Sequence, residues 1–230
     1  MVQALRVPAT RRTLAKQQTR RRLIEAAKAL VAERGYDAAT LRDVAALAGM
    51  STGAVFANFA DKADLFNEVM IDELSDLLVQ MKRKAAVSTS PRDALVDMLA
   101  AGYAAYAERL SLAQALLGFS WSRSSALEQR CQSLIRMILD ALAEVLRMGI
   151  QSGELAPRID ADLIAEMAWD GYVANFRRAI FDSWTLEALR VRLARQVDML
   201  LDGAVRRDAQ PSCLASGGVS RQNFPAALRG

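Results

Sequence analysis

The chain has 230 residues, 52% hydrophobic and 24% charged, so it can bury a sizeable core and has an ordinary globular composition. Charge interrupts every apolar run well before the roughly 18–20 residues that a membrane-spanning helix needs, so we expect no such helix. Residues 1–62 hold 11 Lys/Arg against 5 Asp/Glu, whereas the remainder holds 19 against 21, so the basic character belongs to the N-terminal quarter.

Helical periodicity runs through nearly the whole chain and strand alternation is almost absent, which predicts an all-α fold of about nine helices. Residues 1–18 are basic and predict a flexible arm. The first helix then presents Leu23, Ala27 and Leu30 on one face, and Gly35 follows as its C-terminal cap.

The stretch from Thr40 to Asp61 predicts two short helices joined by a tight turn. Thr40 is the expected N-cap of the first helix, Ser51 caps the second, and Gly49 supplies the positive φ of the turn. This is the layout of a helix-turn-helix, whose second helix lies in the major groove of DNA. A plain helical hairpin within a core is the alternative.

The two helices of this unit must pack closely, so we expect small residues at their contact and larger apolar residues beneath it. The expected buried set is Val44, Ala45, Ala48, Met50, Val55 and Phe59. The remaining face of the second helix is expected to face the groove. It carries Thr52, Gly53, Ala54, Phe56, Ala57 and Asn58.

A body of longer helices follows. Phe66, Met70 and Leu77 mark the apolar stripe of a helix that continues to about Lys84. The further helices are expected at 91–108, 110–119, 124–151, 161–181 and 185–206. The helix at 161–181 is apolar almost all round and must therefore be covered on more than one side.

Aromatic and sulfur-containing side chains of the middle helices are candidates for a small-molecule pocket, although each could instead be core. They are Tyr103, Tyr106, Phe119, Trp121, Met137, Trp169, Tyr172 and Phe176. Arg177 adds a hint of an acidic ligand or of an ion pair at an interface.

The stretch from Thr19 to Met70 resembles the N-terminal domain of TetR-family transcriptional repressors. The resemblance lies in TRRRLIEAAKALVAERGYDAAT, LRDVAALAGMSTGAVFANF and DKADLF, continuously and without gaps. It implies an N-terminal three-helix DNA-binding head at 19–64 on a larger helical ligand-binding and dimerisation domain at 65–208. The Pro-, Ser- and Gly-rich residues 209–230 predict a disordered tail.

By that resemblance Thr40 and Lys62 contact phosphates, and Ser51 to Asn58 form the recognition helix with its cap. Thr52, Phe56 and Asn58 stand where the family often has Lys, Tyr, and His or Tyr, so this helix is expected to anchor phosphate weakly. Basic residues of the arm and the first helix could compensate, although a solubilising tail is the alternative for residues 1–15. They are Arg6, Arg11, Arg12, Lys16, Arg20, Arg21 and Arg22.

The resemblance further implies a repressor that binds a palindromic operator in double-stranded DNA as a homodimer through the helices at 161–181 and 185–206. An unidentified small-molecule effector would release it. A monomer with a buried central helix is the alternative to the dimer. An architectural DNA-binding protein without a ligand is the alternative to the regulator.

The alternative from another functional class is an enzyme on a helical scaffold. The chain has no histidine, no phosphate-binding glycine loop and no G-x-S-x-G motif, and Cys131 and Cys213 form no metal or redox spacing. We therefore expect no catalysis, no cofactor and no metal. Met1–Leu14 has arginines without a following apolar stretch, so we expect no secretory signal and a cytoplasmic location.

Overall fold

The computed structural model describes the backbone of residues 11–120 and 125–202 and, outside residues 119–129, their side chains. Within those ranges the regular elements are helices, with no strand, as the periodicity predicts. They are α1 (Arg11–Arg34), α2 (Leu41–Leu47), α3 (Thr52–Phe56), α4 (Lys62–Ala85), α5 (Pro91–Tyr106), α6 (Leu110–Ser120), α7 (Ser125–Ser152), α8 (Ala161–Phe181) and α9 (Leu186–Leu201).

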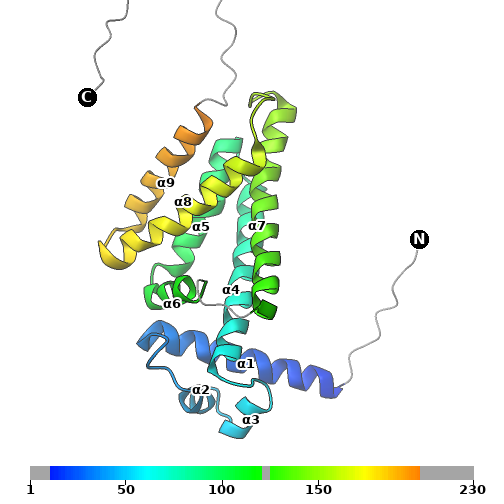
Figure 1. Ribbon diagram of the computed structural model, residues 1–230, viewed down its shortest axis with the longest axis vertical. Helices are drawn as coiled ribbons and strands as arrows, with labels where there is room; N and C mark the ends of the chain where they lie inside the picture. The colour runs from blue at the N-terminus through cyan, green and yellow to red at the C-terminus, as the bar shows by residue number, and fades with distance from the viewer. Residues whose placement is uncertain (1–10, 121–124, 203–230) are drawn as a thin grey trace, which may run out of the picture.

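The helices form a small head at one end of a larger body (Figure 1). The head consists of α1, α2 and α3, and α4 runs from it into the body, where it packs against α5 and α7. α8 packs against α7 and α9, and α9 packs against α5. Because α1 lies crosswise beneath the body and contacts both α4 and α6, the longest helix of the head also forms its junction with the body.

Local capping sets the helix starts where the sequence predicts them. The Thr40 side chain accepts from the Asp43 backbone N–H, and the Asp43 carboxylate accepts from the Thr40 N–H, which completes a capping box at α2. Ser51 caps α3 and Ser90 caps α5, each by accepting the backbone N–H three residues on. Gly49 between α2 and α3 has φ +65°, a left-handed conformation that favours glycine.

α1 begins earlier than the sequence suggests. The helix starts at Arg11, so residues 11–18 of the expected flexible arm form its first turns, and they are exposed. Residues 1–10 of the arm and the expected tail at 209–230 lie outside the described residues.

The body core places α5 unusually close to α8. Tyr103 on α5 and Tyr172 on α8 are buried and stack at 4.9 Å between ring centroids. The neighbouring Gly102 is so tightly covered that a Cβ there would lie 1.9 Å from Tyr172 Oη. A glycine at this position therefore lets the two helices meet.

α8 and α9 each leave an apolar strip uncovered. On α8, Leu163 and Met167 are 50% exposed and Phe181 is 65% exposed, opposite a face buried against the body. On α9, Val191 and Met199 are 50% and 80% exposed. α8 is covered by α6, α7 and α9, as its apolar character predicts, but its apolar strip remains exposed in the single chain. No described helix is long and apolar enough to cross a membrane.

Candidate functional site

The packing of α2 against α3 follows the predicted pattern. Ala45, Ala48, Val44, Val55 and Phe59 are buried, and Met50 is half-buried. Arg22 on α1 donates through Nη2 to the Ala48 carbonyl at 2.7 Å, which ties the first helix to the turn. The two-helix unit is therefore held rigidly on α1.

One face of α3 and its cap contributes little to that packing. The residues exposed there are Ser51, Thr52, Gly53, Phe56 and Ala57. Phe56 is 57% exposed, a large apolar ring turned to solvent. Ala54 is half-buried. This face can enter a groove because the core of the head does not depend on it.

Asn58 differs from the rest of the predicted recognition face. Its carboxamide Nδ2 donates back to the Ala54 carbonyl at 2.8 Å, and its Oδ1 is buried without a hydrogen-bond partner among the described residues. The side chain therefore lies along its own helical turn, and it must change rotamer before it can reach a base edge.

Arg20 and Arg21 are adjacent in sequence but have different surroundings. Arg20 donates to the Asn58 carbonyl at 2.7 Å, forms an ion pair with Glu68 at 3.1 Å and lies 4.3 Å from the centroid of the Phe59 ring. Arg21 is exposed and makes no ion pair or hydrogen bond with a described residue. Arg20 thus holds the end of the α3 turn against α4, whereas Arg21 is available to a phosphate.

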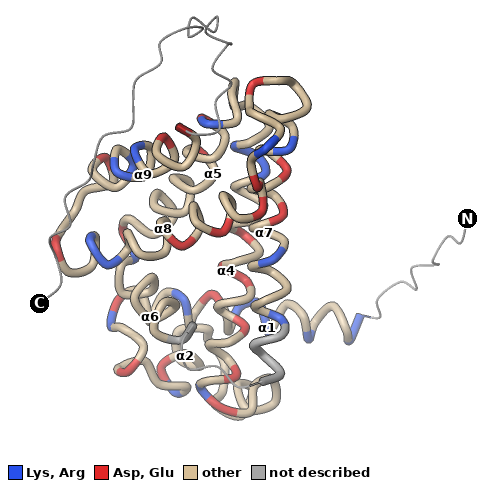
Figure 2. Tube along the Cα trace, turned by 45° about the horizontal axis from the view of Figure 1, so that its top comes forward, with Lys and Arg blue, Asp and Glu red and all other residues tan. Residues whose placement is uncertain are grey.

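Thr40 and Lys62 line one small hollow between α1, α2 and the start of α4. The Lys62 ammonium lies 4.2 Å from the Tyr36 ring centroid and donates to the Asp37 carbonyl at 3.2 Å, so its position is fixed at the start of α4. The Thr40 hydroxyl is exposed but donates to Asp43 Oδ2 at 2.6 Å. Basic positions recur along α1, where Arg11, Arg12 and Lys16 are exposed (Figure 2).

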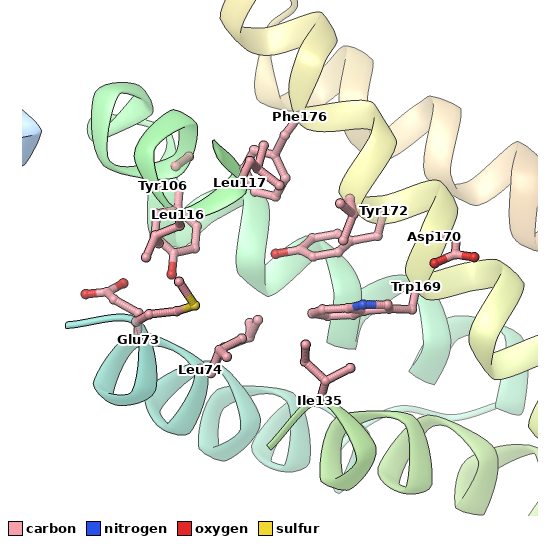
Figure 3. Close-up of a pocket in the computed structure, with 14 residues that line it drawn as sticks. Glu73, Leu74, Tyr106, Leu116, Leu117, Ile135, Trp169, Asp170, Tyr172 and Phe176 are labelled. Carbon is pink, nitrogen blue, oxygen red and sulfur yellow. The ribbon is translucent and has the colours of Figure 1, made fainter. Parts of the chain in front are cut away.

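A second site lies in the body, as a cavity of about 250 Å³ between α4, α5, α6, α7 and α8. Its lining is mostly apolar and aromatic (Figure 3). The described lining residues are Met70, Glu73, Leu74, Leu77, Tyr106, Ala113, Leu116, Leu117, Ile135, Trp169, Asp170, Tyr172, Val173 and Phe176. The volume lies just below the range of about 300 to 1,000 Å³ that is usual for ligand sites, which suits a small ligand.

The structure brings four of the predicted pocket residues together, namely Tyr106, Trp169, Tyr172 and Phe176. Their rings form a continuous cluster, because the Tyr172 centroid lies 5.1 Å from that of Trp169 and 5.2 Å from that of Phe176. The ring of Phe176 also meets Tyr106 edge-on at 5.8 Å.

Three other candidates are not among the described lining residues. Tyr103 lies in the core behind Tyr172, Met137 is 48% exposed, and Arg177 is exposed beside the Phe181 ring. The side chains of Phe119 and Trp121 lie outside the described residues.

Sequence reasoning missed Glu73, which is 6% exposed at one end of the cavity. The sequence does carry a signal for it. Glu73 falls between Met70 and Leu77 on the apolar stripe of α4, where a charged residue must find a partner in the core.

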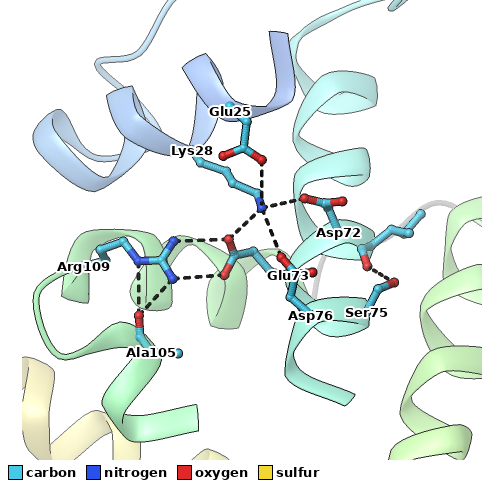
Figure 4. A network of polar contacts seen from close by, with 9 residues as sticks. Glu25, Lys28, Asp72, Glu73, Ser75, Asp76, Ala105 and Arg109 are labelled. Atoms are coloured by element: carbon cyan, nitrogen blue, oxygen red, sulfur yellow. Dashed lines mark hydrogen bonds and ion pairs between the residues drawn. The ribbon is translucent and has the colours of Figure 1, made fainter. Parts of the chain in front are cut away.

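The partner of Glu73 is a lysine of the head, Lys28 on α1 (Figure 4). Lys28 Nζ lies 3.0 Å from Glu73 Oε1 and 2.6 Å from Asp72 Oδ2, and Arg109 Nη1 lies 3.2 Å from Glu73 Oε1. Burial alone would lower the pKa of Lys28, but the hydrogen bond to Asp72 and the charge of Glu73 outweigh it and raise the pKa. Lys28 therefore stays charged.

Tyr106 completes this polar end of the cavity. Burial raises the pKa of its phenol, and the charge of Glu73 and a hydrogen bond with it act in the same direction. The phenol stays protonated, and Arg109 lies 5.3 Å from its ring centroid. No cluster of described His, Cys, Asp or Glu side chains could hold a metal ion.

The comparisons with known proteins agree with this two-part architecture. Residues 23–69, which run from the middle of α1 through α2 and α3 into α4, match the model of bacterial regulatory proteins of the tetR family. The HTH-type transcriptional repressor KstR2 of Mycobacterium tuberculosis H37Rv is 30% identical over 149 residues, which are 62% of this chain and 72% of that protein. The chain belongs to the TetR family and is a DNA-binding transcriptional regulator.

Two solved structures show the same fold. FadR from Bacillus subtilis, in complex with stearoyl-CoA, superposes with a TM-score of 0.67 at 20% identity, over 77% of this chain and 96% of that one. SmeT, the repressor of the Stenotrophomonas maltophilia multidrug efflux pump SmeDEF, superposes with a TM-score of 0.63 at 21% identity. The superposition covers 87% of this chain and 98% of SmeT.

Proposed function

We propose that the protein binds a palindromic operator as a homodimer and that a small molecule in the body cavity releases it. The observation that carries the proposal is the exposed face of α3, because Thr52, Phe56 and Ala57 project from a rigid head without serving its core. A recognition helix needs such a face to reach base edges in the major groove.

In this proposal the exposed face of α3 reads the bases, and Thr40, Lys62 and Arg21 contact the flanking phosphates. Lys62 suits this role because Tyr36 and the Asp37 carbonyl fix its ammonium beside the head surface. Arg20 acts as a positioning residue, since its guanidinium is already engaged by Asn58 and Glu68. Phosphate contacts of this kind set register and affinity, and base contacts set sequence choice.

The dimer would form through the uncovered strips of α8 and α9. Leu163, Met167, Phe181, Val191 and Met199 expose apolar surface in two neighbouring helices, and such surface favours burial against a partner. A two-fold axis there would present two α3 helices to half-sites about 34–36 Å apart, or a multiple of that distance.

The cavity is the proposed effector site because apolar and aromatic side chains line it and because it abuts the junction with α1. The likeness to FadR, which was solved with stearoyl-CoA, does not carry that ligand over. The lining residues described here include no lysine or arginine to pair with the phosphates of such a molecule.

Selection of genomic DNA fragments by the purified protein tests the DNA-binding part of the proposal. We expect enrichment of a palindrome and a dimer mass by light scattering. Met167→Glu, which puts a charge into the α8 strip, should give monomers and weaken operator binding. Val87→Glu, at a 75% exposed position beyond α4, is the matched control. It should leave the dimer mass and the operator affinity unchanged. Fragments without two-fold symmetry, or a dimeric Met167→Glu protein, would contradict the proposal.

A further inference from the structure

The charged residues that line the body cavity are both acidic. Among the described lining residues Glu73 and Asp170 are carboxylates, and no lysine or arginine accompanies them. Figure 3 draws them at opposite ends of the cavity, with the rings of Trp169 and Tyr172 between them. A ligand that fills the space therefore meets aromatic faces along its length and a carboxylate at its end.

Glu73 belongs to a cluster in which negative charge is in excess. Lys28 and Arg109 are its cations, and four carboxylates surround them within 4 Å (Figure 4). The carboxylates are Glu25 at 3.6 Å, Asp72 at 2.6 Å, Glu73 at 3.0 Å and Asp76 at 3.9 Å from Lys28 Nζ. Solvent screens much of this excess, because the side chains of Glu25, Asp72 and Asp76 are 56%, 43% and 67% exposed. The carboxylate that is buried, and that lines the cavity, is Glu73.

We propose that the cavity binds a small lipophilic cation whose positive group pairs with Glu73. This inference rests on the proposed function, namely that the cavity is the effector site. The aromatic rings that line the cavity give apolar contact to the ligand. Their ring faces carry partial negative charge, which attracts a cation. An anion of the same shape would meet the buried Glu73 carboxylate, and the described lining holds no lysine or arginine. Asp170, at the other end, is exposed to solvent.

The same contact gives the ligand a route to the DNA-binding head. Glu73 is on α4 and lines the cavity, yet its carboxylate also holds Lys28 of α1. A cation on Glu73 competes with Lys28 for that carboxylate. Lys28 then keeps Asp72, which is 2.6 Å away and 43% exposed, but loses its buried partner on α4. α1 is then held less firmly against α4, which shifts the population away from the head position that fits the operator.

Calorimetric titration of the full-length protein with three phenylbutyl compounds tests the charge preference. The compounds are 4-phenylbutylamine, which is a cation at pH 7, the neutral 4-phenylbutan-1-ol and the anion 4-phenylbutanoate. We expect the amine to bind at least tenfold more tightly than the alcohol, and the butanoate to bind more weakly than the alcohol. Equal affinities, a preference for the alcohol or the anion, or no binding by any of the three would overturn the inference.

Two variants on α4 locate the effect. Glu73→Gln keeps the shape of the side chain and removes its charge, so the amine should lose its advantage over the alcohol. Asp76→Asn, one turn further on, removes a carboxylate that does not line the cavity, and the advantage should remain. An unchanged preference in Glu73→Gln, or its loss in both variants, would refute the role of Glu73.

Operator binding separates this inference from the proposed function. The amine should weaken operator binding by wild type and Asp76→Asn and should have little effect on Glu73→Gln. Release by the alcohol or the butanoate alone would preserve the proposed function and overturn the cation site. Failure to select any operator would overturn the proposed function, whatever the calorimetry gives.

Discussion

Replacing Gly102 with alanine tests how closely α5 packs against α8. The new Cβ would lie 1.9 Å from Oη and 2.7 Å from Cζ of Tyr172. Non-bonded carbon contacts prefer about 3.5–4.0 Å, so the ring must move by more than about 1 Å or the helices must separate. Tyr172 cannot move freely, because its ring is buried against Tyr103, Trp169 and Phe176.

Overpacking of this kind costs about 1–3 kcal/mol, and the better helix propensity of alanine offsets about 0.5–1 kcal/mol of it. We therefore expect Gly102→Ala to lower the free energy of unfolding by about 1–2 kcal/mol. For a chain of this length each kcal/mol lowers Tm by about 2–4 °C. Urea and thermal denaturation followed by far-UV circular dichroism, at one protein concentration, measure the change.

Gly118→Ala is the matched control, because a Cβ at this exposed position in α6 meets no atom within 4 Å. The same chemical change should there stabilise the protein by up to about 1 kcal/mol. Tyr172→Phe removes the atom nearest the new Cβ, so it should restore part of the stability lost in Gly102→Ala. If both glycine variants shift stability in the same direction, the close approach of α5 and α8 is not as described.

Three further predictions concern the head and the body. Arg21→Gln should reduce the slope of log affinity for the operator against log salt concentration by about 0.9 per subunit, without changing Tm. Arg20→Gln should instead lower Tm. If the two variants behave identically, Arg21 is not the phosphate contact and Arg20 is not the positioning residue. Gly49→Ala should cost about 1–2 kcal/mol because its φ is +65°, and an unchanged Tm would refute strain in the turn. The hydrogen bond from Arg92 lowers the pKa of Asp198, so this exposed pair stabilises the fold above about pH 4 and its contribution is lost as the pH falls through the lowered value. Asp198→Asn should then lower the free energy of unfolding by at most about 1 kcal/mol at pH 7. Denaturation measured at a series of acid pH values should show the variant and wild type converging below about pH 4. A difference in stability that does not change with pH would argue against the pair.

The sequence predicted the parts of the fold that depend on neighbouring residues. Caps at Thr40, Ser51 and Ser90, and the positive φ of Gly49, follow from interactions within a few positions of the chain. The early start of α1 was missed because residues 11–18 carry good helix formers but no apolar stripe or cap. Apolar periodicity detects a helix that packs, and these turns are exposed.

The site was harder to predict, because a cavity is the space that packed helices leave. Tyr103 and Tyr172 are equally plausible pocket residues in sequence. In the structure Tyr172 lines the cavity, whereas Tyr103 packs behind it. The pairing of Lys28 with Glu73 joins two helices far apart in the chain. A charged residue on each apolar stripe is a signal that the sequence analysis did not use, and periodicity within one helix does not say which partner such a residue has.

Under the proposed function, in which α3 reads the operator and the cavity holds the effector, the double engagement of Glu73 makes the two specificities of this regulator unequal in how freely they can evolve. Thr52, Phe56 and Ala57 can change without loss of core packing, so a new operator is accessible through single substitutions in α3. Aromatic positions such as Phe176 can likewise reshape the cavity. A substitution at Glu73 alters the fit of the ligand and the attachment of the head at once. Adaptation to a ligand of opposite charge would therefore require a compensating change at Lys28.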